Sequence, residues 1–254
     1  MSGARQTISE PTGQEYGLSK VVAAWAVHAF TASGIVFGFL ALIAILKGNE
    51  AQAFLWLGIA LFVDGIDGAL ARRARVTEVI PQFDGRTLDN VVDFFNYVAV
   101  PVMMIYWFNL VPDGFRTVAS AAIMAVSLYT FANNGVKSDD YYFVGFPAVW
   151  NLVVLCFLLI GTYLWLNLAI IALCLVLTPT QLHFVHPLRV KDFRPITIAA
   201  TFLWGATTLW LVLERGGYVD TAHPLVFWLW AASCLWFLGL SAWRSFRPED
   251  STAA

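Results

Sequence analysis

The chain has few charged side chains for its length. Of its 254 residues only 13% are charged, whereas 59% are hydrophobic. An average soluble domain carries about a quarter charged residues, so the composition excludes an ordinary soluble protein and indicates a membrane protein. The net charge of -2 says little by itself, and no nucleic-acid partner is predicted.

The cysteines and histidines lack the spacing of disulfide or zinc sites. Cys156, Cys174 and Cys234 all lie in apolar runs without a Cys-x-x-Cys or Cys/His pattern, which is typical of small core residues. His28 is expected to be a hydrogen-bonded residue of a membrane span, and the other histidines show no metal spacing. Residues 1–19 contain no apolar core segment, so we expect a short cytoplasmic arm rather than a cleaved signal peptide.

Long apolar runs dominate the rest of the chain. A helix needs about 20 apolar residues to cross a bilayer, and eight stretches meet this length. They are residues 21–46, 51–72, 87–109, 115–133, 143–161, 163–180, 196–213 and 224–243. The sequence therefore predicts an all-α polytopic bundle, with one transmembrane domain over residues 20–243 and a tail over residues 244–254.

The basic residues predict how this bundle is oriented. An even number of spans puts both termini on one side of the membrane. If that side is the cytoplasm, twelve of the 15 basic residues lie inside, and Lys47, Arg116 and Arg215 lie outside. This bias follows the positive-inside rule, so both termini are expected to be cytoplasmic.

Four aspartates stand near the cytoplasmic face, where the second and third expected spans meet. They lie in the run Asp64-Gly-Ile-Asp67-Gly68-Ala-Leu-Ala71-Arg72 and, after a spacer, in Gly85-Arg-Thr-Leu-Asp89-Asn-Val-Val-Asp93. Residues three or four apart share one face of a helix, so two such helices can bring the carboxylates together. Carboxylates this close repel one another and are costly beside hydrocarbon. A pair of divalent cations among them would balance that charge.

The same runs leave space beside the carboxylates. Gly68 and Ala71 fall on the helix face that carries Asp64 and Asp67, and their small side chains leave room for a bulky group such as a nucleotide.

This combination of residues resembles the signature of the CDP-alcohol phosphotransferase family, Asp-x-x-Asp-Gly-x-x-Ala-Arg followed by Gly-x-x-x-Asp-x-x-x-Asp. The spacer from Arg73 to Asp84 has twelve residues, more than in most members, and is similar to that of the branch that makes phosphatidylcholine. Pro81 favours a loop within the spacer. Residues 28–34, 139–151 and 186–195 also resemble that branch.

The resemblance implies a reaction in which the phosphatidyl group of CDP-diacylglycerol passes to choline, giving phosphatidylcholine and CMP. It further implies two Mn2+ or Mg2+ ions, contacts with membrane lipids, a homodimer and a place in the bacterial inner membrane. The implied metal ligands are Asp64, Asp67, Asp89 and Asp93, and Asp93 would also deprotonate the alcohol. The implied nucleotide contacts are Asp64, Gly68, Ala71, Arg72 and Gly85.

Two further groups of residues are weaker candidates. Arg189, Lys191 and Arg194 are predicted to bind the donor phosphate or lipid headgroups, although the positive-inside rule explains them equally well. A quaternary ammonium binds against aromatic faces. The predicted choline pocket comprises Asp139, Asp140, Tyr141, Tyr142, Phe146 and Trp150.

Two other functions stay open at this point. The first is a synthase of the same family that uses serine, glycerol 3-phosphate or inositol in place of choline. The second is a cation transporter, because carboxylates within a membrane often mark ion pathways. The aspartates gather at one face rather than at the midplane, and the sequence shows no inverted repeat, so the enzyme is favoured.

Overall fold

The computed structural model describes residues 16–133, 138, 140–219 and 223–247, and these are mostly helical. The expected arm lies outside the described residues over positions 1–15, as does the tail over positions 248–254. The longer α-helices are α1 (Leu18–Leu46), α2 (Glu50–Ala74), α4 (Gly85–Phe94), α5 (Val100–Trp107), α6 (Arg116–Ala132), α7 (Trp150–Ile160), α8 (Leu164–Leu177), α9 (Arg194–Arg215) and α10 (Pro224–Phe246). The short elements are α3 (Val76–Val79), η1 (Phe95–Ala99), η2 (Asp113–Phe115), β1 (Phe143–Val144) and β2 (His183–Phe184).

Six of the eight expected spans are helices long and apolar enough to cross a membrane. They run over Leu18–Leu46, Glu50–Ala74, Gly85–Trp107, Asp113–Ala132, Arg194–Arg215 and Pro224–Phe246. The prediction of a multi-pass helical membrane protein is therefore confirmed. The remaining apolar helices, α7 and α8, have 11 and 14 residues, which is shorter than the length of about 20 that a full crossing needs.

The predicted start of the fifth span, at residue 143, is wrong. Residues 143–149 form β1 and a loop, and α7 begins only at Trp150. Gly145 and Ala148 both have positive φ angles, 78° and 55°, which an α-helix does not accept. An apolar composition alone does not separate such a buried loop from a helix.

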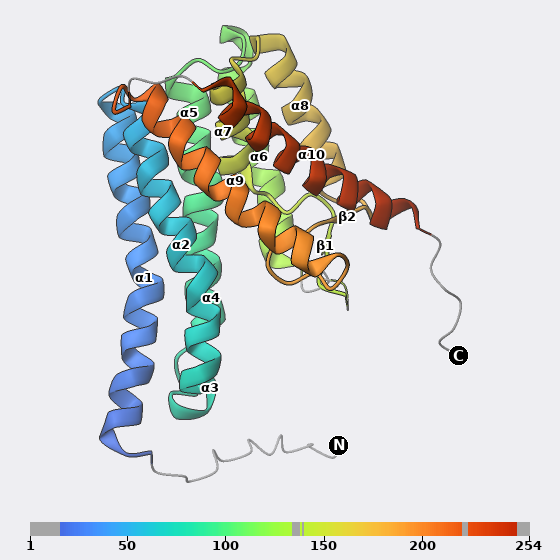
Figure 1. The fold of residues 1–254 in the computed structure, drawn as a ribbon. Helices are drawn as coiled ribbons and strands as arrows, with labels where there is room; N and C mark the ends of the chain where they lie inside the picture. The colour runs from blue at the N-terminus through green and yellow to red at the C-terminus, as the bar shows by residue number, and fades with distance from the viewer. Residues whose placement is uncertain (1–15, 134–137, 139, 220–222, 248–254) are drawn as a thin grey trace, which may run out of the picture.

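The helices α1, α2 and α4 form the part of the bundle that carries the aspartates. The first two lie side by side along most of their length, and α4 lies next to them (Figure 1). Glycines on α1 allow α4 to approach closely, because a Cβ on Gly34 would stand 2.8 Å from Cγ1 of Val92. Asn96 uses the same gap and donates a hydrogen bond from Nδ2 to the Gly34 carbonyl oxygen at 3.1 Å. Small residues at helix contacts in membrane proteins let the helix backbones approach closely.

A π-helical turn, η1, follows α4 within the third span. The amide of Val100 donates to the carbonyl of Phe95, five residues earlier. Pro101 stands next to it and has no amide hydrogen to offer the carbonyl of Tyr97, with which its ring would clash in a regular helix. Proline thus explains the wider turn, and turns of this kind are frequent at functional sites.

The loops that join α6 to α7 and α8 to α9 form a small cap. We define the cap as residues 140–149 together with residues 178–193. Its two halves pair through β1 and β2, which are antiparallel with Phe143 opposite Phe184. The amide of Gly145 also donates to the carbonyl of Leu182 at 2.8 Å. The hairpin of α9 and α10 runs obliquely past this cap (Figure 1).

Candidate metal and phosphate site

Three of the four aspartates converge between α2 and α4. Asp64, Asp89 and Asp93 each offer a carboxylate oxygen, and these oxygens all lie within 4.8 Å of one another. The carboxylates are half-buried, and each has interactions with neighbouring residues. Oxygen donors at this spacing suit Mg2+ or Mn2+, so these side chains fit the divalent cation that the sequence predicts.

Asp67 takes a different position from the other three. Its side chain is buried at 6% exposure, and Thr31 of α1, the Gly68 amide and Arg189 surround it. Three residues rotate a helix by about 300°, so Asp67 points about 60° away from Asp64, toward α1. Among the described residues, Asp67 is not part of the carboxylate group that could share one metal. Its role as a metal ligand stays a prediction.

Tyr97 completes the carboxylate site, although no motif in the sequence indicates a role for it. Its hydroxyl donates a hydrogen bond to Oδ2 of Asp64 at 2.5 Å, and Asp89 and Asp93 lie close to the same hydroxyl. Tyr97 stands four residues after Asp93, within the π-helical turn. The signal that could have found it is this spacing together with Pro101, which lies four residues further along.

Replacing Tyr97 with phenylalanine should weaken metal binding at the three aspartates. The variant removes the hydrogen bond that orients Asp64, and loss of such an outer partner typically costs about 10- to 100-fold in metal affinity. Titration of purified protein with Mn2+ measures this change. Tyr129→Phe, at an exposed tyrosine of α6, is the matched control. Equal Mn2+ affinity in Tyr97→Phe and the wild type would exclude this role for the phenol.

Two arginines meet on the glycine face of α2. A Cβ placed on Gly68 would stand 3.4 Å from Nη1 of Arg72 and 3.5 Å from Nη2 of Arg189. The absence of a side chain at Gly68 therefore leaves room beside two guanidinium groups. Such groups bind phosphate oxygens with paired hydrogen bonds. Arg189 comes from the cap, and the structure brings it next to Gly68 of the aspartate motif.

The other predicted nucleotide contacts lie where α1, α3 and α4 meet. Gly85 starts α4, and a Cβ there would stand 2.9 Å from Cε1 of His28. Nε2 of His28 is buried and has no hydrogen-bond partner within the described part of the chain, which differs from the hydrogen-bonded histidine that the sequence predicts. Phe83 packs against the His28 ring with centroids 4.4 Å apart. Ala71 packs against the apolar cluster between α1 and α3.

The remaining basic candidates lie elsewhere around the cap. The Nζ atom of Lys191 lies over the ring of Tyr141, 5.4 Å from its centroid. Arg194 is the first residue of α9, and its side chain is exposed. Of these three basic residues, Arg189 is the one that the structure places beside Gly68.

Several aromatic residues of the predicted choline pocket are buried against other side chains of the protein. Trp150 is fully buried and donates from Nε1 to the Ser127 hydroxyl at 2.9 Å, and Phe146 packs against Trp150 in the core. The ring of Tyr142 is also fully buried. Tyr141 is exposed. Asp139 lies outside the described residues, so the pocket stays a prediction.

Comparisons with known proteins show which family the chain resembles. A model of the CDP-alcohol phosphatidyltransferase family matches residues 26–180, which include all four aspartates. The chain is 42% identical to a phosphatidylcholine synthase of Pseudomonas aeruginosa over 88% of this chain and 92% of that protein. It is 36% identical to a phosphatidylcholine synthase of Rhizobium johnstonii, over 85% of this chain and 88% of the relative. A phosphatidylcholine synthase of Borreliella burgdorferi is 35% identical over 72% of this chain and 78% of its own length.

Proposed function

The chain belongs to the CDP-alcohol phosphatidyltransferase family, and we propose that it transfers the phosphatidyl group of CDP-diacylglycerol to choline. The products are phosphatidylcholine and CMP. The observation that carries the proposal is the convergence of Asp64, Asp89 and Asp93 beside the guanidinium groups of Arg72 and Arg189. The choice of choline rests on the relatives named phosphatidylcholine synthase. Membership in a transferase family leaves the cation transporter without support.

The chemistry that we assign to the aspartates is metal binding and proton removal. In this proposal Asp64, Asp89 and Asp93 hold divalent cations, which would stabilise the charge of the diphosphate and of the departing CMP. Asp93 takes the proton of the choline hydroxyl. The choline oxygen then forms a bond to the phosphorus that carries diacylglycerol, and the bond from that phosphorus to the CMP oxygen breaks.

The donor's headgroup is proposed to lie along the glycine face of α2. Arg72 and Arg189 flank Gly68 and would bind its phosphate oxygens. Asp64, Gly68, Ala71, Arg72 and Gly85 remain the proposed nucleotide contacts.

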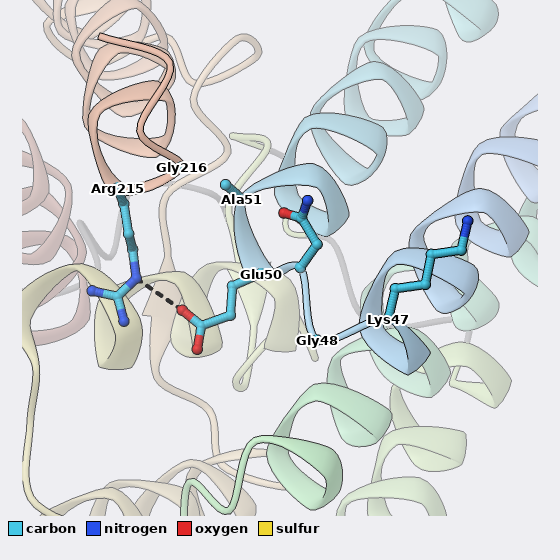
Figure 2. A pocket seen from close by; sticks show the side chains of 7 residues that line it. Lys47, Gly48, Glu50, Ala51, Arg215 and Gly216 are labelled. Carbon is cyan, nitrogen blue, oxygen red and sulfur yellow. Dashed lines mark hydrogen bonds and ion pairs between the residues drawn. The ribbon is translucent and has the colours of Figure 1, made fainter. Parts of the chain in front are cut away.

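We place the aspartates on the cytoplasmic side of the bacterial inner membrane, with both termini there. Lys47 and Arg215, two of the three basic residues assigned to the other side, line one cavity where α1, α2 and α9 meet (Figure 2). This cavity lies at the N-terminal end of α2, whereas Asp64 and Asp67 lie in its C-terminal half. We retain α7 and α8 as a pair that enters or crosses the membrane, which keeps the number of crossings even. A homodimer and contacts of exposed apolar faces with lipid complete the proposal.

Choline should support CMP release from CDP-diacylglycerol at least about tenfold faster than other alcohols, a ratio within reach of binding-site discrimination. Purified protein with Mn2+ would be given choline, serine, glycerol 3-phosphate or inositol in parallel, and the released CMP measured. The aspartate site accepts any alcohol in principle, so the acceptor panel tests the branch of the family. Use of serine, glycerol 3-phosphate or inositol with no use of choline would refute this choice of acceptor.

A further inference from the structure

The C-terminal helix α10 lies outside residues 26–180, which the family model matches, and its apolar sequence predicts only a membrane span. Its last turns carry polar side chains that point at the cap. The hydroxyl of Ser241 accepts a hydrogen bond from the amide of Val185 at 3.0 Å, and that of Ser245 accepts one from the amide of His183 at 2.8 Å. These hydroxyls therefore satisfy the backbone of β2 and the residue after it.

Arg244 lies between these serines and ties α10 to the other half of the cap. Its Nε donates to Oδ2 of Asp140 at 2.6 Å, and its guanidinium lies over the ring of Tyr142. The Arg244 side chain is only 17% exposed. Burial opposes ionisation of Asp140, but hydrogen bonds from Ser138 and Arg244 and the charge of Arg244 outweigh it, so the pKa of Asp140 lies below its ordinary value. The pair is therefore charged at neutral pH.

The same contacts enclose the segment that carries Arg189. Tyr142, Val190 and Leu240 of α10 form a buried apolar cluster, so the residue after Arg189 is packed against α10. Burial raises the pKa of Tyr142, and the nearby Asp192 carboxylate raises it further. Tyr142 therefore stays protonated and donates from its hydroxyl to Asp192 at 3.1 Å. The chain is thus anchored both before Arg189 and after it.

We propose that α10 is a positioning element of the active site, in which Arg244, Ser241 and Ser245 hold the cap so that the guanidinium of Arg189 stays beside Gly68. The functional meaning of this placement rests on the proposed function, because Arg189 is there assigned to the donor's phosphate. Arg189 itself is exposed and sits in a turn, where its amide donates to the His186 carbonyl. Its position therefore depends on the anchored residues on either side. Arg244 is a positioning residue because it acts through them.

The test compares two variants, Arg244→Ala and Arg215→Ala. The second removes a matched ion pair at the other end of the molecule. Arg215 pairs with Glu50 at 2.9 Å (Figure 2), far along α9 from the cap, so Arg215→Ala removes a similar contact away from Arg189. Hydrogen exchange of residues 183–192 measures how firmly the cap is held. Arg244→Ala should speed this exchange about 10- to 100-fold, which corresponds to the loss of a charged hydrogen bond, whereas Arg215→Ala should leave it unchanged.

The second readout is the affinity of the protein for CDP-diacylglycerol and for CMP. Arg244→Ala should raise the KM for CDP-diacylglycerol and weaken CMP binding about tenfold, within the roughly 100-fold that a misplacement of about 1 Å can cost. Arg244→Lys should restore part of the loss, as should the exchanged pair Asp140→Arg with Arg244→Asp.

Unchanged exchange in Arg244→Ala would overturn the proposal, and so would faster exchange with unaltered CMP binding. These two readouts need no choline turnover. They therefore decide the role of α10 even if the wild type fails to use choline, a result that would refute the proposed function alone.

Discussion

Replacement of Asp93 by asparagine should reduce choline-dependent CMP release by about 10²- to 10⁴-fold, the usual contribution of a general base. Asparagine has the same shape as aspartate but cannot accept the choline proton. Asp93 lies with Asp64 and Asp89 in the carboxylate group, and the other two carboxylates stay in place to hold metal in the variant. The measurement is CMP release at saturating Mn2+ and choline, with Mn2+ binding followed separately.

Asp113→Asn is the matched control for this variant. Asp113 is 85% exposed and pairs with Arg116 at 2.9 Å, away from the carboxylate site, so CMP release should stay within about twofold, as for most surface substitutions. CMP release by Asp93→Asn close to the wild-type rate would remove Asp93 from the role of base. An equal loss of CMP release in Asp93→Asn and Asp113→Asn would instead indicate a general effect of replacing an aspartate.

Replacement of Asp64 by asparagine should act mainly on metal binding. At low Mn2+ the variant should release CMP at least about 100-fold more slowly than the wild type, since loss of even an outer partner of a metal ligand costs up to about that much. Higher Mn2+ concentrations should restore part of the rate. Asparagine keeps an oxygen that can accept the hydrogen bond of Tyr97, so the charge is the property removed.

The Mn2+ dependence separates Asp64→Asn from Asp93→Asn. Added Mn2+ should rescue the first variant in part and the second hardly at all, because a missing base is not replaced by metal. Glu78→Gln, at an exposed acidic residue paired with Arg75, should leave the Mn2+ dependence unchanged. An Asp64→Asn variant with the wild-type Mn2+ dependence would contradict the assignment of Asp64 as a ligand.

The sequence predicted the parts of the site that depend on helical spacing. Asp89 and Asp93 stand four residues apart on α4, which begins at Gly85, so one face carries both as expected. Pro81 favoured a loop in the spacer, and residues 80–84 form one between α3 and α4. Asp67 shows the limit of this reasoning, because three residues bring side chains to one side of a helix but leave an angle of about 60° between them.

The parts that spacing could not predict depend on tertiary contacts. Arg189 is far from Gly68 in the sequence, and its position follows from the cap and α10. Tyr97 depends on a π-helical turn that changes which residues share a face. The apolar residues before Trp150 predict part of a membrane span. The positive φ angles of Gly145 and Ala148 instead place these residues in a buried loop. Hydropathy reports burial, not the conformation of the buried segment.

The most direct test of the proposed site is CMP release from CDP-diacylglycerol by metal-stripped wild-type protein as Mn2+ is added, with and without choline. Three converging carboxylates and an alcohol acceptor predict that CMP appears only when Mn2+ and choline are both present. The phosphatidylcholine formed should equal the CMP released. Choline-dependent CMP release without any divalent metal, or metal-dependent release that choline does not alter, would contradict the account.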